Sequence, residues 1–380
     1  MTKQTKFNKK SYLFIAVIAA IILVFGYHYF YKDIAMIDLP KEQQQQVTAL
    51  LSNSPTRCVG TYLIDLPIGF KIKKEGRFDY KSNGDITITT KPQYLPPFKQ
   101  MISLREQELK DTKTIDPIDS PYLKAVYPVH TNHPDKMQGI IFERMESPGT
   151  DDSARVLEGY RWQDEVMLKI EMKAQNGSDK KHDENRMKYP ELYTNDVPQK
   201  LLELRKLFVR IQPRDDLTIP IRPGFCLLNS FMLGEDREWK DMNYGYWHES
   251  IDEFSFYFEF NDFADDYALL DKPEGYFTQG AGHTIYKGTR ESQGLKLEEW
   301  VVKGKYFEDA QGFNADNMGY IFTLGIHVTD PSYKTPRLRV EMFYKIPLDK
   351  TQAYSEEQLM VIWREITNSI RIRDSSFESK

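Results

Sequence analysis

Residues 254–260, Phe-Ser-Phe-Tyr-Phe-Glu-Phe, decide the fold of this 380-residue chain. Four phenylalanines alternate here with smaller or more polar side chains. A period of two predicts a β-strand, because successive side chains of a strand point to opposite faces of the sheet. All four rings therefore belong on one face, and we interpret them as the core of a sheet rather than as a platform for a ligand.

Further strands are predicted on both sides of this stretch, and their order occurs twice along the chain. In the first half they cover 62–66, 76–80 and 85–90, and Asn83-Gly84 marks a hairpin because this pair tolerates the positive φ angles of a tight turn. In the second half they cover 227–233, 253–260, 283–286, 296–303, 320–328 and 337–344. This repetition predicts two modules of related build.

Each half also ends in a predicted amphipathic helix. Asp196 is the candidate N-cap of the first helix, and Ser355-Glu356-Glu357-Gln358 is a capping box for the second. The apolar stripes are Leu201, Leu204, Phe208 and Ile211 in the first helix and Leu359, Ile362, Trp363, Ile366 and Ile370 in the second. The predicted fold class is therefore α+β, with two modules over residues 55–214 and 215–375, each a mostly antiparallel sheet with a closing helix.

The N-terminal segment has the pattern of a membrane anchor. Four lysines precede an apolar run from Tyr12 to Tyr27, and about 20 apolar residues suffice to cross a membrane as a helix. A cleaved signal peptide is the alternative, but no small-residue cleavage site follows the run. We expect residues 1–32 to form a cytoplasmic tail and transmembrane signal anchor and residues 33–54 to form a linker.

The charge of the chain disfavours a nucleic-acid partner. Residues 1–32 hold five lysines and no acid, so the remaining chain has 46 basic and 56 acidic residues, a formal charge of −10. Phosphate backbones bind to basic surfaces. An acidic surface fits solubility or a basic protein partner better.

The chain has two cysteines, Cys58 and Cys226, each at the start of a predicted β region. An exported chain meets conditions that permit disulfides, and a bridge across so long a loop would stabilise the fold by several kcal/mol. Two buried free thiols are the alternative. The sequence leaves both readings open.

No motif of a standard enzyme, cofactor site or metal site is visible in the sequence. The chain lacks a Gly-x-Ser-x-Gly elbow, a His-Glu-x-x-His helix, a phosphate loop and a Cys-x-x-Cys pair. His130 and His133 lie on a Pro-bearing stretch without a third ligand, so we interpret them as a solvated turn. We expect no enzyme activity, no cofactor, no metal and no small-molecule substrate.

Three acids, Asp262, Asp265 and Asp266, resemble a carboxylate cluster. They lack the alternation, central Gly and terminal Glu of a calcium loop. A solvated acidic loop is the main interpretation, and an acidic contact surface for a partner is the functional alternative.

Two stretches resemble a known family. Residues 57–67, Arg-Cys-Val-Gly-Thr-Tyr-Leu-Ile-Asp-Leu-Pro, are similar to the opening of the N-terminal domain of bacterial type VI secretion immunity proteins that neutralise a lipase effector. Pro223-Gly224-Phe225-Cys226, followed by the 254–260 strand and Gly280-Ala281-Gly282-His283, resembles the C-terminal domain of that family. The resemblance covers both modules, from about residue 55 to residue 374.

The resemblance implies inhibition by binding. The partner would be a cognate secreted phospholipase, clasped between the two domains so that its lid cannot open or its substrate cannot enter. The location implied is the bacterial inner membrane, single-pass, with the C-terminal bulk in the periplasm. An anchored inhibitor would also gain effective concentration at that membrane.

Candidate partner contacts are aromatic or acidic. Trp239, Tyr244, Tyr246 and Trp247 give a predicted loop unusual aromatic density, and the acids Asp262, Asp265 and Asp266 are the other candidates. A hydrophobic plug against the neighbouring sheet is an equal interpretation of the aromatic group.

Two other functions stay open at this stage. One is a membrane-tethered periplasmic scaffold or sensor that binds another envelope protein. The other is a hydrolase using scattered acids such as Glu298, Glu299 or Asp309, which the lack of a nucleophile disfavours.

Overall fold

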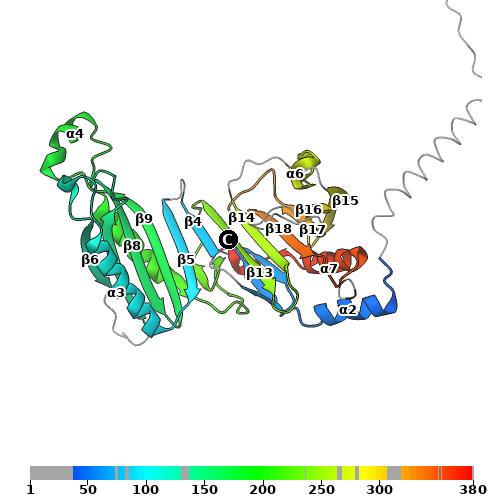
Figure 1. Cartoon of the computed structure of the whole chain (residues 1–380). Helices are drawn as coiled ribbons and strands as arrows, with labels where there is room; N and C mark the ends of the chain where they lie inside the picture. The colour runs from blue at the N-terminus through cyan, green and yellow to red at the C-terminus, as the bar shows by residue number, and fades with distance from the viewer. Residues whose placement is uncertain are drawn as a thin grey trace, which may run out of the picture.

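The structure is a computed structural model that describes residues 37–72, 76–81, 85–129, 137–235, 237–262, 268–278, 282–305, 318–349, 351 and 353–378. Two lobes lie side by side and are joined by a central group of strands (Figure 1). The N-lobe, at the left of Figure 1, contains α3 (Leu95–Asp111), α4 (Asp183–Lys188) and α5 (Val197–Arg210). The C-lobe, at the right, contains α2 (Lys41–Leu51), α6 (Gly275–Thr278) and α7 (Glu356–Asn368).

One antiparallel sheet of 13 strands runs through both lobes. From the C-lobe edge to the N-lobe edge its order is β15 (Gly282–Ser292), β16 (Leu295–Lys305), β17 (Met318–Ile326), β18 (Arg337–Lys345), β14 (Phe254–Asn261), β13 (Lys240–His248), β4 (Gly76–Tyr80), β5 (Ile86–Pro92), β9 (Val166–Gln175), β8 (Ala154–Gln163), β7 (Met137–Met145) and β6 (Leu123–Val129). A further strand, β3 (Phe70–Ile72), also pairs with β13.

Two small sheets lie at the junction of the lobes, and the first of them joins segments that are far apart in the chain. The first is β1 (Thr56–Val59), β2 (Tyr62–Asp65) and β19 (Arg371–Ile372), and the second is β10 (Ile211–Pro213), β12 (Ser230–Leu233) and β11 (Gly224–Leu227). Single 3-10 turns occur at η3 (Pro117–Asp119), η4 (Lys180–His182), η5 (Leu269–Asp271) and η7 (Asp374–Ser376). Because β19 pairs with β2, the C-terminal strand of the C-lobe packs beside a strand of the first half of the chain.

The main core lies on one face of the large sheet and extends through both lobes. The four phenylalanines of β14 are at most 1% exposed, as their alternation predicts. Helix α7 covers them, and the ring of Trp363 stacks on Phe256 with 6.2 Å between centroids. In the N-lobe α5 packs so closely on β8 that a Cβ at Gly159 would lie 2.8 Å from Leu204.

The other face of the sheet has a separate cover in each lobe. In the N-lobe α3 packs Phe98 and Leu109 with Tyr160 and Trp162 of β8. In the C-lobe η5 and α6 pack Leu269 and Phe277 near Trp300, Val302 and Ile321. The central strands β14, β13, β4 and β5 lie between these two covers.

The predicted fold class is wrong in describing two α+β modules with separate sheets. The described chain is mostly sheet, and β13 of the second half pairs with β4 of the first, with Lys240 opposite Tyr80 and Asn243 opposite Arg77. Separate sheets would leave both strands as edges with unpaired N–H and C=O groups. Pairing the two strands satisfies these groups and merges the sheets.

The predicted fold class also includes an N-terminal transmembrane helix, and this element has no support in the structure. None of the helices formed by the described residues combines the length and the apolarity needed to cross a membrane. Residues 1–32, to which the prediction refers, lie outside the described residues. Within the predicted linker, α2 packs on α7, where Gln358 Nε2 donates to Gln46 Oε1 at 2.8 Å.

The two closing helices are confirmed, but only one of the two predicted caps is. Ser355 and Gln358 form the complete capping box of α7. Asp196 precedes α5 without a side-chain capping bond, because its carboxylate accepts instead from the backbone N–H of Gln175 at 2.7 Å. Asn83-Gly84, where the hairpin turn is predicted, lie outside the described residues, and the strands on either side of them, β4 and β5, form an antiparallel pair.

Candidate functional site

The central strands present a polar face between the two lobes, which we call the open face. Cross-strand register places Glu259, Asn243 and Arg77 in one row and Asn261, Asp241 and Asp79 in the next. The side chains of the open face are half-buried or exposed: Arg77, Asp79, Thr87, Thr89, Asp241, Asn243, Trp247, Tyr257 and Glu259. The same strands bury their alternate side chains in the core, so each strand is amphipathic.

Charged side chains of both signs alternate along the open face. Asp79 accepts from Arg77 Nε at 2.7 Å and from Thr87 Oγ1 at 2.9 Å. Glu259 forms an ion pair with Arg337 of β18. Asp241 lies between these pairs, and burial, followed by the charges of Glu259 and Asp79, raises the pKa of its carboxyl. A basic or hydrogen-bond-donating partner group would offset this local excess of carboxylates.

An aromatic cluster adjoins the charged rows. The Trp247 ring meets the Tyr257 ring edge-on at 4.9 Å, and Tyr257 meets Phe343 of β18 at 5.6 Å. All three side chains are half-buried. Partly exposed aromatic rings beside charged rows are typical of protein interfaces, where such rings act as anchors.

The predicted aromatic loop is instead mainly a strand. Residues 240–248 form β13, so alternation divides the aromatic side chains between two faces. Tyr244 and Tyr246 are 5% and 0% exposed in the core, and only Trp247 reaches the open face. Trp239 precedes the strand and is half-buried. The hydrophobic-plug interpretation therefore describes Tyr244 and Tyr246.

The predicted acidic cluster is not gathered in the described residues. Asp262 accepts from the backbone N–H of Lys240 at 2.9 Å, and its carboxylate lies 3.7 Å from Lys240 Nζ. Asp265 and Asp266 lie outside the described residues. Asp262 therefore ties the end of β14 to the start of β13.

Of the acids considered for catalysis, Glu299 has a structural partner and Asp309 lies outside the described residues. Glu299 is fully buried and accepts a hydrogen bond from the indole N–H of Trp363. Glu298 is half-buried on the same strand, and Asp309, like His130 and His133, lies outside the described residues.

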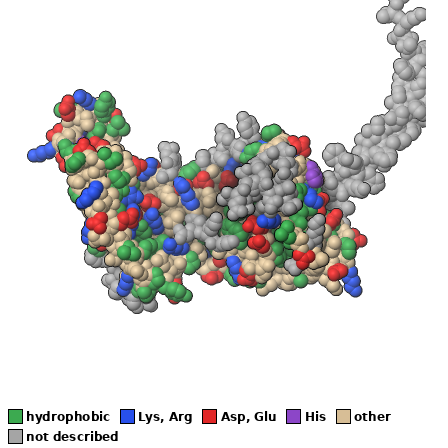
Figure 2. All heavy atoms as spheres, viewed as in Figure 1, with side chains coloured by type: hydrophobic (Ala, Val, Ile, Leu, Met, Phe, Trp, Pro, Cys, Tyr) green, Lys and Arg blue, Asp and Glu red, His purple; other side chains and the backbone are tan. Residues whose placement is uncertain are grey.

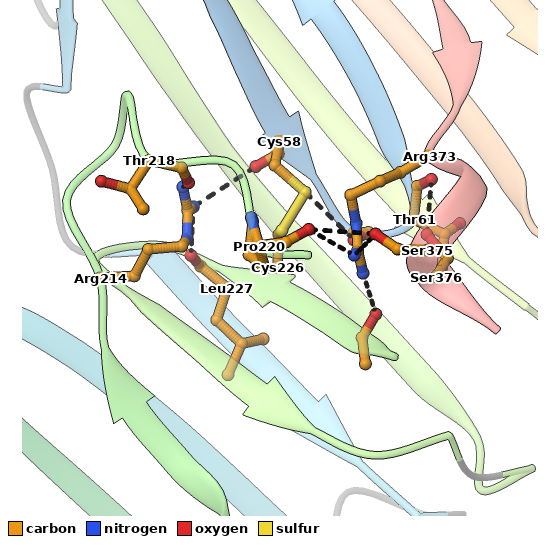
Figure 3. The surroundings of a disulfide bond; sticks show 12 residues. Cys58, Thr61, Arg214, Thr218, Pro220, Cys226, Leu227, Arg373, Ser375 and Ser376 are labelled. Carbon is orange, nitrogen blue, oxygen red and sulfur yellow. Dashed lines mark hydrogen bonds between the residues drawn. A yellow bond between two sulfur atoms is a disulfide. The ribbon is translucent and has the colours of Figure 1, made fainter. Parts of the chain in front are cut away.

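A disulfide between Cys58 of β1 and Cys226 of β11 lies at the junction of the lobes (Figure 3). Its Cα atoms are 5.8 Å apart, and backbone bonds between Gly60 and Cys226, at 2.9 and 3.0 Å, run beside it. Gly60 has φ +61°, and a Cβ there would lie 2.5 Å from the Phe260 ring, so a glycine is required. The bridge joins the first and second halves of the chain.

Two arginines flank this disulfide (Figure 3). Arg214 donates to the backbone oxygens of Cys58 and Leu227 at 3.4 and 3.1 Å. Arg373 donates to the backbone oxygens of Pro220 and Gly224 at 2.9 and 2.5 Å. Burial, together with the Arg214 charge, lowers the pKa of Arg373 to about 10. These bonds fix the segment that connects the two halves.

A third buried arginine, Arg57, secures the same junction. Its Nε forms an ion pair of 2.8 Å with Asp216, and its Nη2 donates to the backbone oxygen of Phe70 at 3.0 Å. The Tyr246 hydroxyl donates to the other oxygen of Asp216 at 2.7 Å. Burial, followed by the charges of Tyr244 and Asp216, raises the pKa of Tyr246 well above its usual value. The lobes are thus held in a fixed relation.

One carboxylate cluster of the N-lobe could be mistaken for a metal site. Asp151, Asp152 and His182 place ligand atoms within 4.8 Å of one another. However, Asp152 already pairs with Lys181 at 2.9 Å and Lys124 at 3.2 Å. Burial would raise the pKa of Asp152, but hydrogen bonds from Lys181, His182 and Lys124 lower it to about 2. We interpret this cluster as an ion-pair network that fixes the tip of the lobe.

The polar residues of the open face were not predicted from the sequence. Tyr257 and Glu259 occupy the alternate positions of β14, whose core positions were recognised, whereas Asp241 and Asn243 lie on β13, which was predicted as a loop. The alternation that predicts the Phe face also predicts that Tyr257 and Glu259 share the opposite face. The pairing of β13 with β4, which adds Arg77 and Asp79, left no signal in the sequence.

Comparison with known proteins identifies the family. The Tle cognate immunity protein 4 N-terminal domain matches residues 55–214, and the C-terminal domain of the same family matches residues 218–375. The chain belongs to the Tle cognate immunity protein 4 family. The protein is thus an immunity protein of a type VI lipase effector, which it binds without being an enzyme. No curated protein sequence matches the chain.

Solved structures share the fold of this immunity protein. A chain of the crystal structure of the Tle4-Tli4 complex matches with a TM-score of 0.60 and 16% identity over 86% of this chain and 99% of that chain. The apo structure of the T6SS immunity protein TplEi from Pseudomonas aeruginosa matches with a TM-score of 0.60 and 18% identity over 86% of this chain and 98% of that chain. The same immunity protein complexed with "L" peptide matches with a TM-score of 0.57 and 18% identity over 85% of this chain and 99% of that chain.

Proposed function

We propose that this immunity protein inhibits a type VI secreted phospholipase by holding it between the two lobes, against the open face, so that lid opening or substrate access is blocked. The open face carries this proposal. It combines charged rows with a partly exposed aromatic cluster and lies between the helical covers of the two lobes. Inhibition by such contact requires no catalytic group.

The rigidity of the junction supports a preformed clasp. The paired strands β13 and β4, the Cys58–Cys226 disulfide and the ion pair between buried Arg57 and Asp216 all connect the two halves. A surface that is already ordered loses little conformational entropy on binding. We therefore expect the lobes to move little between the free and the bound protein.

The surface charge supports a protein partner. On the face shown in Figure 2, Lys and Arg side chains are interspersed with Asp and Glu side chains. A nucleic-acid partner would call for a basic face. Interspersed charges instead favour specificity toward a protein with a complementary pattern.

We further propose that residues 37–380 act in the periplasm. The disulfide supports this location, because such bridges persist in oxidising compartments such as the periplasm. The inner-membrane location predicted from residues 1–32 stays a prediction of the sequence. The scaffold alternative gains no feature of its own from the structure.

Calorimetric titration of the full chain against its cognate phospholipase, with phospholipid hydrolysis followed in parallel, tests the proposal. We expect nanomolar binding at a ratio of one to one and loss of hydrolysis at that ratio. Tight binding with unchanged hydrolysis would disprove the blocking mechanism, and failure to bind would disprove the pairing itself.

A further inference from the structure

The two edges of the large sheet differ in how well they are protected against pairing with a further strand. At the N-lobe edge, β6 contains Pro128, which has no N–H to offer to a neighbour. At the C-lobe edge, β15 contains no proline and lies at the outer margin of the lobe (Figure 1). Within the described part of the chain, no strand pairs with the outer side of β15, which we call the β15 edge.

The hairpin turn after β15 determines which of its residues offer backbone groups to a further strand. Gln293 and Gly294, with φ of +50° and +73°, connect β15 to β16 in a tight turn of type I′. Ser292 and Leu295 close this turn as a hydrogen-bonded pair, and bonded and non-bonded pairs then alternate along the two strands. Three residues of β15 therefore direct their N–H and C=O groups outward: Lys287, Thr289 and Glu291.

The side chains of these three residues carry a charge pattern that is complementary to itself. All three are exposed. The Lys287 ammonium contacts neutral groups, the backbone oxygen of Lys272 at 3.2 Å and the centroid of the Trp300 ring at 3.7 Å. Among the described residues, neither Lys287 nor Glu291 has an ion-pair partner. A second β15, turned by 180° about Thr289, would place a carboxylate opposite each ammonium.

We propose that two copies of this chain associate through their β15 edges, as antiparallel strands with Thr289 of both copies at the two-fold axis. Backbone pairing requires outward residues to face one another, which excludes every register shifted by one residue. Among the other registers, the one centred on Thr289 pairs Lys287 with Glu291 of the partner subunit twice. Centring on Lys287 or Glu291 places like charges opposite each other, which is unfavourable, and the intermediate registers pair neither charge.

The proposed dimer leaves the open face of each subunit free. Strands β16 and β17 lie between the β15 edge and the strands that form the open face. The contact consists of about six backbone hydrogen bonds and two ion pairs, so we expect a weak and reversible dimer in the micromolar range. This inference goes beyond the proposed function and does not depend on it.

Single cysteines introduced into the full chain test the register. Cys58 and Cys226 are joined to each other and the chain has no further cysteine, so an introduced thiol is the only free one. Thr289→Cys brings two thiols face to face, with Cα atoms about 5.5 Å apart, and mild oxidation should link it into dimers.

Glu291→Cys is the matched control, because residue 291 is also exposed and lies on the same face of the same strand. In the proposed register the two copies of residue 291 lie about 14 Å apart, which is too far for a disulfide. Linking of Thr289→Cys alone would support the register. Equal linking of both variants, or linking of neither, would overturn it.

Charge reversal tests the two ion pairs by sedimentation equilibrium of the full chain. Lys287→Glu and Glu291→Lys each place like charges opposite each other twice and should weaken dimerisation about tenfold. The combined variant restores both pairs in reversed order and should dimerise within about threefold of wild type. A wild type that stays monomeric at about 100 μM, or a combined variant no better than the single ones, would overturn the proposal.

Titration against the phospholipase separates the β15 edge from the open face. Lys287→Glu should change affinity for the phospholipase less than about threefold, because the substituted side chain lies away from the open face. A monomeric wild type whose phospholipase binding falls tenfold or more in Lys287→Glu would assign the β15 edge to the phospholipase and overturn self-association. Dimerisation without phospholipase binding would instead disprove the proposed function and support the dimer.

Discussion

The two lobes attach a helix to the same sheet by different means. In the N-lobe, α3 adds a charged contact to its apolar packing, because Arg105 makes two hydrogen bonds of 2.7 and 2.8 Å to the fully buried carboxylate of Glu158. Arg144 donates to the same carboxylate at 2.5 Å. In the C-lobe, α7 docks through aromatic rings, with Trp363 packed on Phe256 and Phe322.

This difference separates two kinds of stability. A buried ion pair depends on the protonation of its members and is costly when one member is removed. An aromatic contact depends on filled volume and is insensitive to pH. The lobes should therefore respond differently to acid and to truncation, although they share one sheet.

Separating the lobes should give the largest effect. Cys58→Ser combined with Cys226→Ser opens a loop of 168 residues and should lower the free energy of unfolding by about 5 kcal/mol, because the unfolded chain regains loop entropy. We also expect urea unfolding to divide into two transitions, one per lobe. Chemical reduction of the wild-type chain is the control, and a loss below about 1 kcal/mol by both routes would show that strand pairing and the arginine contacts hold the junction without the disulfide.

Truncation of the aromatic contact should give the second-largest loss of stability. Trp363→Ala should lower the free energy of unfolding by about 4 kcal/mol, because it empties a fully buried site of the C-lobe. Thermal and urea unfolding would measure the loss.

Two controls sharpen the test at Trp363. Trp363→Phe keeps an aromatic ring but removes the hydrogen bond to Glu299, so the difference between the two variants separates volume from hydrogen bonding. Leu348→Ala, at a side chain that is 90% exposed, should change stability by less than about 0.5 kcal/mol. Equal effects of Trp363→Ala and Leu348→Ala would contradict the role of α7.

The charged contact should respond to both mutation and acid. Glu158→Gln should lower the free energy of unfolding by about 3 kcal/mol at neutral pH, because it leaves Arg105 and Arg144 without their shared carboxylate. Burial would raise the pKa of Glu158, but hydrogen bonds from Arg105, Tyr160 and Arg144 lower it from 4.5 to about 2.

The sign of the pH dependence follows from this lowered pKa. A carboxyl with a depressed pKa in the folded state stabilises the fold fully above its unfolded pKa, here about 4.5, and the contribution disappears as the pH falls through about 2. Wild type should lose about 3 kcal/mol over this window relative to Glu158→Gln. The Phe322→Ala variant, which truncates the aromatic contact without removing a donor from a carboxylate, should keep the wild-type slope, and parallel curves for all three proteins would contradict the comparison.

The sequence predicts the C-lobe better than the N-lobe, because the aromatic contacts of the C-lobe arise from local patterns and the charged contact of the N-lobe does not. Aromatic alternation in β14 and the capping box at Ser355 are local patterns, and both are confirmed. The Arg105–Glu158 contact joins residues 53 positions apart, and nothing local distinguishes these charges from solvated ones. The pairing of β13 with β4 is likewise nonlocal, which is why two modules are predicted where one sheet exists.

The same limit applies to the open face. Trp247 is recognisable as a candidate contact from aromatic density, but its separation from Tyr244 and Tyr246 requires strand rather than loop geometry. Asp79 and Asp241 come together only through the pairing of β4 with β13. Patterns within one strand are thus accessible from the sequence, whereas surfaces that cross strands are not.

The smallest predicted effect concerns where the phospholipase binds. Trp247→Ala should weaken binding of the phospholipase about tenfold, since a partly exposed aromatic anchor is removed from the open face, while the free energy of unfolding changes by less than about 1.5 kcal/mol. Tyr189→Ala is the matched control at the N-lobe tip, where the side chain is 53% exposed, and should bind like wild type. The reverse result, with Tyr189 required and Trp247 dispensable, would move the interface from the shared sheet to the tip of one lobe. The two lobes would then no longer act together in inhibition, and the difference between their helix contacts would matter only for stability.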